Sequence, residues 1–163
     1  MEALRKADGI EFVLTSHEGA AGMMADVCGR LSGVPGACFG TFGPGATNLA
    51  TGVGEALLAR SPMPAFTDEM PEPMRGRTTQ MGIDHQALFK PLTKQTTRLR
   101  ADAVRSIVFG AARTAMEGRP GPVHLSLPSD ILDPSVPESE IVWPTEADFT
   151  ANHQWVKEQL KRE

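Results

Sequence analysis

The chain has 163 residues, of which 40% are hydrophobic and 22% are charged, and its formal net charge is −4. This apolar content supports a packed core in a chain about the size of one domain, which excludes a disordered or fibrous class. The mild, unclustered acidity argues against a nucleic-acid partner or an anionic membrane surface, and no apolar run approaches the roughly 20 residues of a membrane span.

Cys28 and Cys38 are the only cysteines. Two thiols provide neither a disulfide framework nor a four-thiolate zinc site, so a reducing cytoplasm is the expected setting. Cys28 falls within a predicted helix of small residues and is expected to be buried. The histidines lack the spacing of metal ligands and are expected to be structural or solvated, so no metal site is predicted in this chain.

Apolar runs alternate with small-residue helical stretches over the first three-quarters of the chain. The predicted strands are residues 10–14, 37–42, 63–67, 95–99 and 122–127, and the predicted helices are residues 18–31, 46–59 and 101–117, with a short helix near His85. The first run has no polar alternation, which is typical of a strand covered on both faces. Strand–helix alternation at this spacing predicts an α/β fold, a doubly wound parallel sheet with helices on both faces.

The chain changes in character from Ser129 on. The following stretch is acidic and interrupted by prolines, and it ends in a charged segment that spaces apolar residues as a short amphipathic helix over residues 149–160. We therefore expect an α/β domain over residues 1–131, followed by a linker and a short C-terminal helix over residues 132–163.

Glu18 is the first candidate for a functional residue. It lies at a predicted strand-to-helix junction, and ligands of parallel sheets bind at that edge. One interpretation is a carboxylate that complements the helix dipole in the first turn. The other is a carboxylate that contacts a flat ligand, with the small residues 19–21 leaving the helix start uncrowded.

The turn Gly43-Pro44-Gly45 and the following Asn48 form the second candidate. A dinucleotide fingerprint Gly-x-Gly-x-x-Gly fails because its third glycine is replaced by Asn48, and no P-loop motif is present. The segment is therefore either a tight turn at a helix start or a site where backbone amides and the Asn48 side chain face a polar ring.

Other polar residues carry weaker signals. Asp68 and Glu69 follow a predicted strand and reach the ligand edge, but an exposed acidic loop is the simpler interpretation. Lys94 and three further basic residues of the same region could form a basic rim, and a solvated loop explains them equally well.

An ordered set of motifs resembles thiamine-diphosphate-dependent enzymes of the acetolactate synthase type. The matching stretches are residues 16–26 (SHEGAAGMMAD), 30–36 (RLSGVPG), 41–48 (TFGPGATN), 85–86 (HQ), 91–94 (PLTK), 118–123 (GRPGPV) and 127–130 (LPSD). Any one of them is weak, but together they run in order through most of residues 7–131.

The resemblance implies the N-terminal pyrimidine-binding domain of these enzymes, with the thiamine-diphosphate-binding fold in an N-terminally truncated form. Glu18 would be the catalytic glutamate that hydrogen-bonds N1′ of the aminopyrimidine ring and so activates the thiazolium. Gly43, Pro44, Gly45 and Asn48 would bind the cofactor together with Glu18. The implied activity is that of a lyase or transferase, the decarboxylation or carboligation of a small 2-keto acid.

The same resemblance implies an incomplete enzyme. The Gly-Asp-Gly motif and distant Asn that hold Mg²⁺ and the diphosphate do not occur in the sequence, and Asp68-Glu69 stands where relatives carry Gly-Gln. We therefore expect the chain to be inactive alone, with Mg²⁺ supplied by a separate diphosphate-binding subunit or by a homo-oligomer such as a dimer. The alternative is a non-catalytic remnant, or a protein-binding or oligomerisation module.

Overall fold

The computed structural model describes residues 4, 6–75, 77 and 81–132. The unit expected over residues 132–163, with its helix, lies outside this range apart from Leu132. The expectations for that unit therefore remain predictions.

One parallel sheet forms the centre of the molecule, with the strand order β1-β2-β4-β3. The strands are β1 (Cys38–Gly40), β2 (Met63–Glu69), β3 (Gln95–Arg98) and β4 (Pro122–Pro128). The central strands β2 and β4 pair along their whole length, from Met63 opposite Pro122 to Glu69 opposite Pro128. Both are almost wholly buried, as is typical of central strands in a parallel sheet that is covered on both faces.

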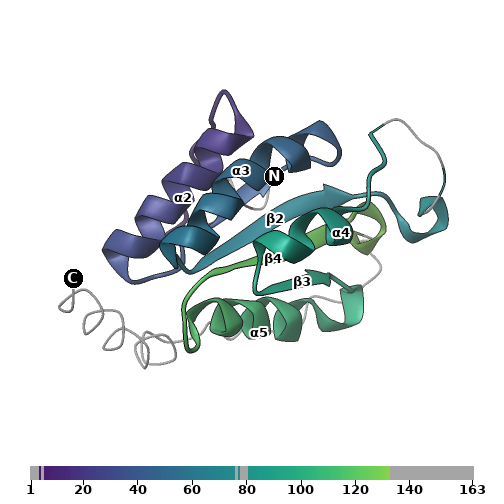
Figure 1. Cartoon of the computed structure of the whole chain (residues 1–163). Helices are drawn as coiled ribbons and strands as arrows, with labels where there is room; N and C mark the ends of the chain where they lie inside the picture. The colour runs from purple at the N-terminus through teal and green to yellow at the C-terminus, as the bar shows by residue number, and fades with distance from the viewer. Residues whose placement is uncertain (1–3, 5, 76, 78–80, 133–163) are drawn as a thin grey trace.

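Helices cover both faces of this sheet (Figure 1). They are α2 (Glu18–Ser32), α3 (Pro44–Ala59), α4 (His85–Phe89) and α5 (Val104–Met116), and short 3-10 helices lie at Glu72–Met74, Lys90–Leu92, Ala101–Ala103 and Ser129–Leu132. One core cluster joins α2, α3 and α4 to the sheet, and a second lies under α5. The predicted α/β fold, a doubly wound parallel sheet covered on both faces, is confirmed.

The boundaries of α2 and α3 follow from local chemistry. His17 caps α2 because its Nδ1 accepts the backbone N–H of Gly19 at 3.0 Å, and Gly33 ends the helix with a φ of 71°. Gly43 is the N-cap of α3, and Pro44 occupies the first turn, where its missing N–H costs nothing. Each helix therefore starts directly at one of the two candidate segments.

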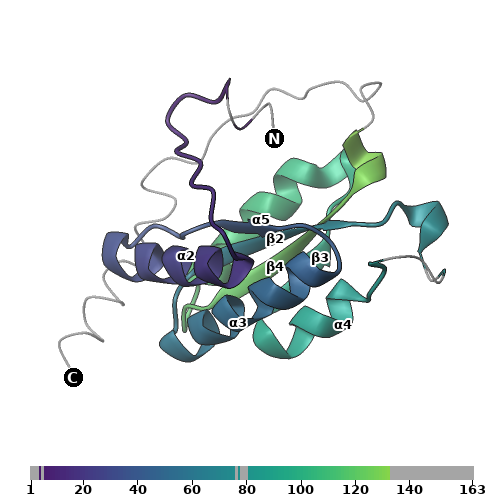
Figure 2. The same ribbon diagram turned by 90° about the horizontal axis from the view of Figure 1, so that it is seen from above.

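The strand predicted over residues 10–14 is wrong. This segment is extended but pairs with no strand in the described part of the chain, and Leu14 is 85% exposed. Figure 2 shows it rising away from the layer of helices and strands before it enters α2. Apolar content alone does not make a strand, because the backbone also needs a neighbouring strand as hydrogen-bond partner.

Close contacts fix α2 against its neighbours. A Cβ built on Gly22 would lie only 2.9 Å from Cα of Gly52, so the two helix backbones touch at these glycines. Further along α2, the buried Asp26 accepts a hydrogen bond from the Ser61 hydroxyl and an ion pair from Arg30 at 2.7 Å. These partners satisfy a carboxylate that would otherwise be costly to bury, and the Ser61 bond ties α2 to the segment between α3 and β2.

Candidate functional site

Glu18 and Asn48 meet although 30 positions separate them in the chain. Asn48 Nδ2 donates to Glu18 Oε2 at 3.1 Å. α2 and α3 lie side by side and both begin on the side toward which β2 points (Figure 1). The glycine contact between the helices brings their first turns together, so the two predicted site segments form one site.

The Glu18 carboxylate is stabilised in its charged form. Its own backbone N–H, the Asn48 amide and the neighbouring His17 hold the pKa of the carboxyl below its ordinary value, while partial burial opposes them. Glu18 is therefore an ionised hydrogen-bond acceptor at neutral pH, at the N-terminal end of a helix.

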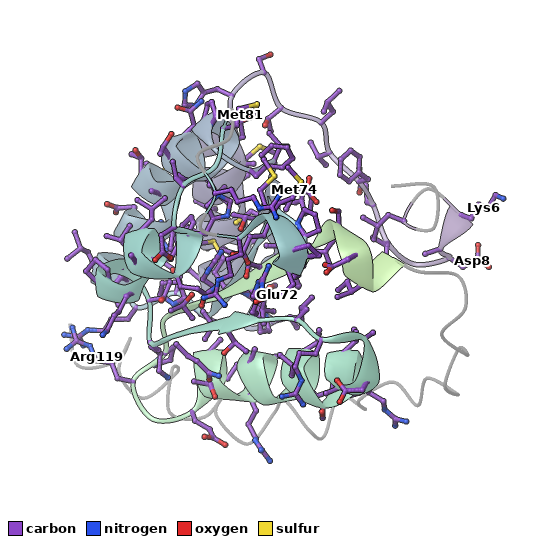
Figure 3. The ribbon with its side chains drawn as sticks, turned by 90° about the vertical axis from the view of Figure 1, so that its right-hand side faces the viewer. Lys6, Asp8, Glu72, Met74, Met81 and Arg119 are labelled. Carbon is purple, nitrogen blue, oxygen red and sulfur yellow. The ribbon has the colours of Figure 1, made fainter. Side chains whose placement is uncertain are left out.

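The turn at Gly43-Pro44-Gly45 packs closely beside this carboxylate. A Cβ on Gly45 would lie 3.3 Å from Glu18 Oε1 and 2.7 Å from Thr41 Cγ2, so any larger residue would crowd the carboxylate. Gly43 adopts a φ of 66°, which favours glycine, and a Cβ there would lie 2.7 Å from Cβ of Met81. Met81 is labelled in Figure 3, where it lies at the rim of the molecule on this side.

His85 contacts the turn, a role that the sequence analysis did not assign to it although residues 85–86 are among the matching motifs. Its Nε2 accepts the backbone N–H of Gly43 at 3.2 Å, and the side chain is 1% exposed. Helix α4 places it there across a separation of 42 residues. The contact depends on how α4 packs, for which the spacing of residues along the chain offers no signal.

The interpretation of Asp68 and Glu69 as an exposed acidic loop is wrong. They are the last two residues of β2, and Glu69 is only 9% exposed. Arg98 on β3 donates from Nε to Glu69 Oε2 at 2.8 Å and also pairs with Glu72, which Figure 3 labels beside Met74. Because Arg98 neutralises it, Glu69 is held within the sheet edge as half of an ion pair.

Two further expectations are corrected by the packing. Cys28 is exposed and Cys38 is buried, because the buried positions of α2 follow the face of residues 22, 25, 26 and 29, which does not include Cys28. Lys94 does not contribute to a basic rim, because its Nζ donates to the backbone carbonyls of Thr114 and Glu117 at the C-terminal end of α5.

Within the described residues, no three His, Cys, Asp or Glu side chains are grouped to hold a metal ion. Over the same residues, none of the helices has the length and apolar character needed to cross a bilayer.

Together, the fold and site define an α/β protein with a carboxylate–amide pair at the aligned N-termini of two parallel helices. Comparison with known families agrees with this class: residues 1–88, more than half of the chain, match the family model described as thiamine pyrophosphate enzyme, N-terminal TPP binding domain. The chain therefore belongs to the thiamine pyrophosphate enzyme family, as its motifs suggested.

Several curated relatives are acetolactate synthases. The chain is 38% identical over 149 residues to a probable acetolactate synthase large subunit of Methanocaldococcus jannaschii, covering 91% of this chain and 25% of the relative. It is 43% identical over 133 residues to a probable acetolactate synthase large subunit of Methanococcus aeolicus, covering 81% of this chain and 22% of the relative. The acetolactate synthase isozyme 1 large subunit of Escherichia coli is 34% identical over 131 residues, which cover 80% of this chain and 23% of the relative. The chain thus spans about a quarter of the length of these relatives.

Proposed function

We propose that this chain binds the aminopyrimidine ring of thiamine diphosphate and forms half of the active site of an acetolactate synthase-like enzyme. The observation that carries the proposal is the Glu18–Asn48 pair, joined at 3.1 Å beside a glycine turn. Family membership supports this assignment. Residues 1–131 would be the pyrimidine-binding domain and residues 132–163 a linker that leads away from it.

The residues present fit such a ring. Asn48 binds Oε2 of Glu18, and the other oxygen, Oε1, lies beside Gly45. The lack of a side chain at Gly45 would let the edge of a planar ring approach Oε1, while Thr41 and Met81 pack against the turn. Pro44 is exposed at the tip of the turn and offers an apolar surface beside it.

The proposed chemistry assigns a proton-holding role to Glu18. As an ionised acceptor it would hold a proton at the ring nitrogen N1′, and Asn48 would orient the carboxylate for that bond. Thiamine diphosphate, when bound, supplies a thiazolium carbon that adds to a 2-keto acid and accepts the electrons released on decarboxylation. The substrate would be a small 2-keto acid, as the acetolactate synthase relatives suggest.

The remaining parts of the site would come from another polypeptide or another domain. Mg²⁺ is usually held by carboxylates together with phosphate oxygens, and such a group is absent from the described residues. We therefore propose that the diphosphate and Mg²⁺ are bound by a separate diphosphate-binding subunit or by a partner in a homo-oligomer such as a dimer. Activity would require that partner, and the cytoplasm is the proposed location.

A second candidate function is a non-catalytic module for protein binding or oligomerisation, retained as a remnant of the enzyme. The observation that favours it is a run of apolar side chains on the outer face of α2 and on the segment before it. The exposed members are Ile10, Phe12, Val13, Leu14, Met23, Met24, Val27 and Leu31. Large apolar side chains exposed on one element are typical of an interaction site.

Thiamine itself is the sharpest probe, because it carries the aminopyrimidine without the diphosphate. Titrated into the full ¹⁵N-labelled chain, it is expected to shift the amide resonances of Glu18, Gly43 and Asn48. Glu18→Gln should weaken binding by about tenfold or more, since a neutral amide replaces the charged acceptor. Glu55→Gln, which changes an exposed carboxylate on α3, should leave binding unchanged.

The second measurement tests catalysis. The chain is mixed with a diphosphate-binding subunit, Mg²⁺, thiamine diphosphate and pyruvate, and release of carbon dioxide is followed. Activity that disappears with Glu18→Gln supports the enzyme. If thiamine shifts no site resonance and the mixture stays inactive, the proposal is wrong, and self-association of the chain in analytical ultracentrifugation would then favour the binding module.

A further inference from the structure

A run of hydrogen bonds crosses the core from the Gly43 turn to the central strands. His85 Nε2 accepts the Gly43 backbone N–H at 3.2 Å, and His85 Nδ1 lies 3.0 Å from Thr67 Oγ1. The same hydroxyl lies 2.9 Å from His124 Nε2. His85 and His124 are each 1% exposed and Thr67 is fully buried, so water does not replace these bonds.

The run continues from β4 through β3 and back to α4. His124 Nδ1 lies 2.6 Å from Thr96 Oγ1, which donates to Gln86 Oε1 at 2.9 Å. Gln86 Nε2 then donates to Ser126 Oγ at 2.8 Å. Phe89 stacks on the His124 ring with centroids 4.1 Å apart. The network therefore ties one backbone amide of the candidate site to three strands and to α4.

One arrangement of protons satisfies every bond. The Gly43 N–H can only donate, so His85 Nε2 is an acceptor and the neutral ring carries its proton on Nδ1. His85 Nδ1 donates that proton to Thr67 Oγ1, and the Thr67 hydroxyl in turn donates its own proton to His124 Nε2. His124 must therefore also carry its proton on Nδ1, where Thr96 accepts it. All the bonds point away from Gly43, and both rings are neutral.

We propose that His85, as the neutral Nδ1-protonated tautomer, is the positioning residue of the candidate site, and that a proton on its Nε2 releases the Gly43 turn. The reason is geometric. A protonated Nε2 would place an N–H against the Gly43 N–H, and the turn would lose its buried acceptor. Gly43 is the N-cap of α3, which carries Asn48, so the release would move the partner of Glu18. The functional consequence rests on the function proposed above.

The charges around His85 oppose one another. Glu69 on β2 and Asp84 at the start of α4 favour the charged ring, and the backbone of Asp68 adds a hydrogen bond. Burial disfavours the charge more strongly and lowers the pKa of His85, and His124 on β4 is neutral beside it. The ring is thus neutral at physiological pH and takes up a proton on the acid side of the usual histidine range.

NMR spectroscopy of the full ¹⁵N-labelled chain tests this proposal without any ligand. Two-bond correlations of the imidazole nitrogens at neutral pH should show both His85 and His124 as Nδ1-protonated tautomers. On acidification, the amide shift of Gly43 and the side-chain amide shift of Asn48 should follow the titration of the His85 ring. The amide of Gly118, a positive-φ glycine with open space around it, should not follow it.

Two variants separate positioning from simple packing. In His85→Gln, Oε1 can accept the Gly43 N–H but does not titrate. The Gly43 amide should therefore stay protected from hydrogen exchange, and its chemical shift should no longer change with pH. In His85→Leu, exchange of that amide should accelerate by about tenfold, the order expected when one buried hydrogen bond is lost. Because the titration of the unmodified chain needs no variant, the proposal stays testable if either variant fails to fold.

The proposal would be overturned if His85 were Nε2-protonated at neutral pH, or if the amide chemical shift of Gly43 did not follow the titration of His85. A different result would count against the proposed function alone: thiamine leaves Asn48 unaffected, while Gly43 still follows His85. In that case His85 positions the turn, but the turn is not a cofactor site.

Discussion

Gly52 on α3 lies so close to Gly22 on α2 that a Cβ built on Gly52 would be 2.6 Å from Cα of Gly22. This contact sets the separation of the two helices and therefore the distance between Glu18 and Asn48 at their N-terminal ends. The candidate site depends on it, although neither glycine contacts the site.

Gly52→Ala is expected to lower the free energy of unfolding by about 2–3 kcal/mol, because backbone atoms cannot move aside as a flexible side chain would. Gly54→Ala on the same helix is the matched control. Its Cβ would meet only Leu92 Cδ2 at 3.7 Å, so the gain in helix propensity should leave stability unchanged or raise it by up to about 1 kcal/mol. Urea unfolding of both variants measures the difference, and equal stabilities would contradict the helix contact.

Asn48→Asp should reverse the pKa shift of Glu18. The substitution replaces a donor by a second carboxylate against Glu18 Oε2, and two neighbouring negative charges raise the pKa of the carboxyl. Asn48→Ala, which removes the donor without adding charge, should move that pKa only toward its ordinary value. A ¹³C NMR titration of the Glu18 carboxyl distinguishes the two, and identical titrations in both variants would show that the two side chains do not interact.

The buried histidines should make the protein less stable in mild acid. Burial lowers the pKa of His124 to about 3 from 6.5, and the pKa of His85 is lowered for the same reason. Below pH 6.5 the unfolded chain therefore binds protons that the folded chain does not. Stability is full above that pH and is lost as the pH falls, by roughly 1.4 kcal/mol per pH unit for each such histidine.

Urea unfolding at pH 7.5 and pH 5.0 measures this loss, in a range where most carboxylates stay ionised in both states. A decrease of about 2 kcal/mol or more is expected. His124→Gln should show a smaller decrease between the same pH values. A pH-independent free energy of unfolding in the unmodified chain would mean that the rings are accessible to protons in the folded state.

The two cysteines should differ sharply in reactivity. Cys38 is buried and its pKa is raised to about 12, so its reactive thiolate is scarce at pH 8. Cys28 is exposed on the outer face of α2. An aromatic disulfide reagent should therefore modify one thiol quickly and the second only after urea is added. Cys28→Ser should abolish the fast phase and Cys38→Ser should retain it, whereas two fast phases would show that β1 opens readily.

Much of the architecture could be predicted from the chain because it depends on local patterns. The strands β2 and β4 lie where the sequence places them, Gly33 ends α2 as predicted, and α3 begins at Pro44, two residues before its predicted start. The segment at residues 10–14 also carries an apolar signal and is no strand. Pairing is a property of two segments, and a single segment does not reveal whether its partner is present.

The sequence by itself determined the α/β class, the family and the two segments that hold Glu18 and Asn48. These follow from periodicity, from turn chemistry and from an ordered set of motifs. Only the tertiary structure decided that the Glu18 and Asn48 side chains meet, that Arg98 neutralises Glu69 and that His85 holds the Gly43 turn. Each of these contacts joins residues about 30 or more positions apart, and packing and burial select such partners, which no local pattern along the chain encodes.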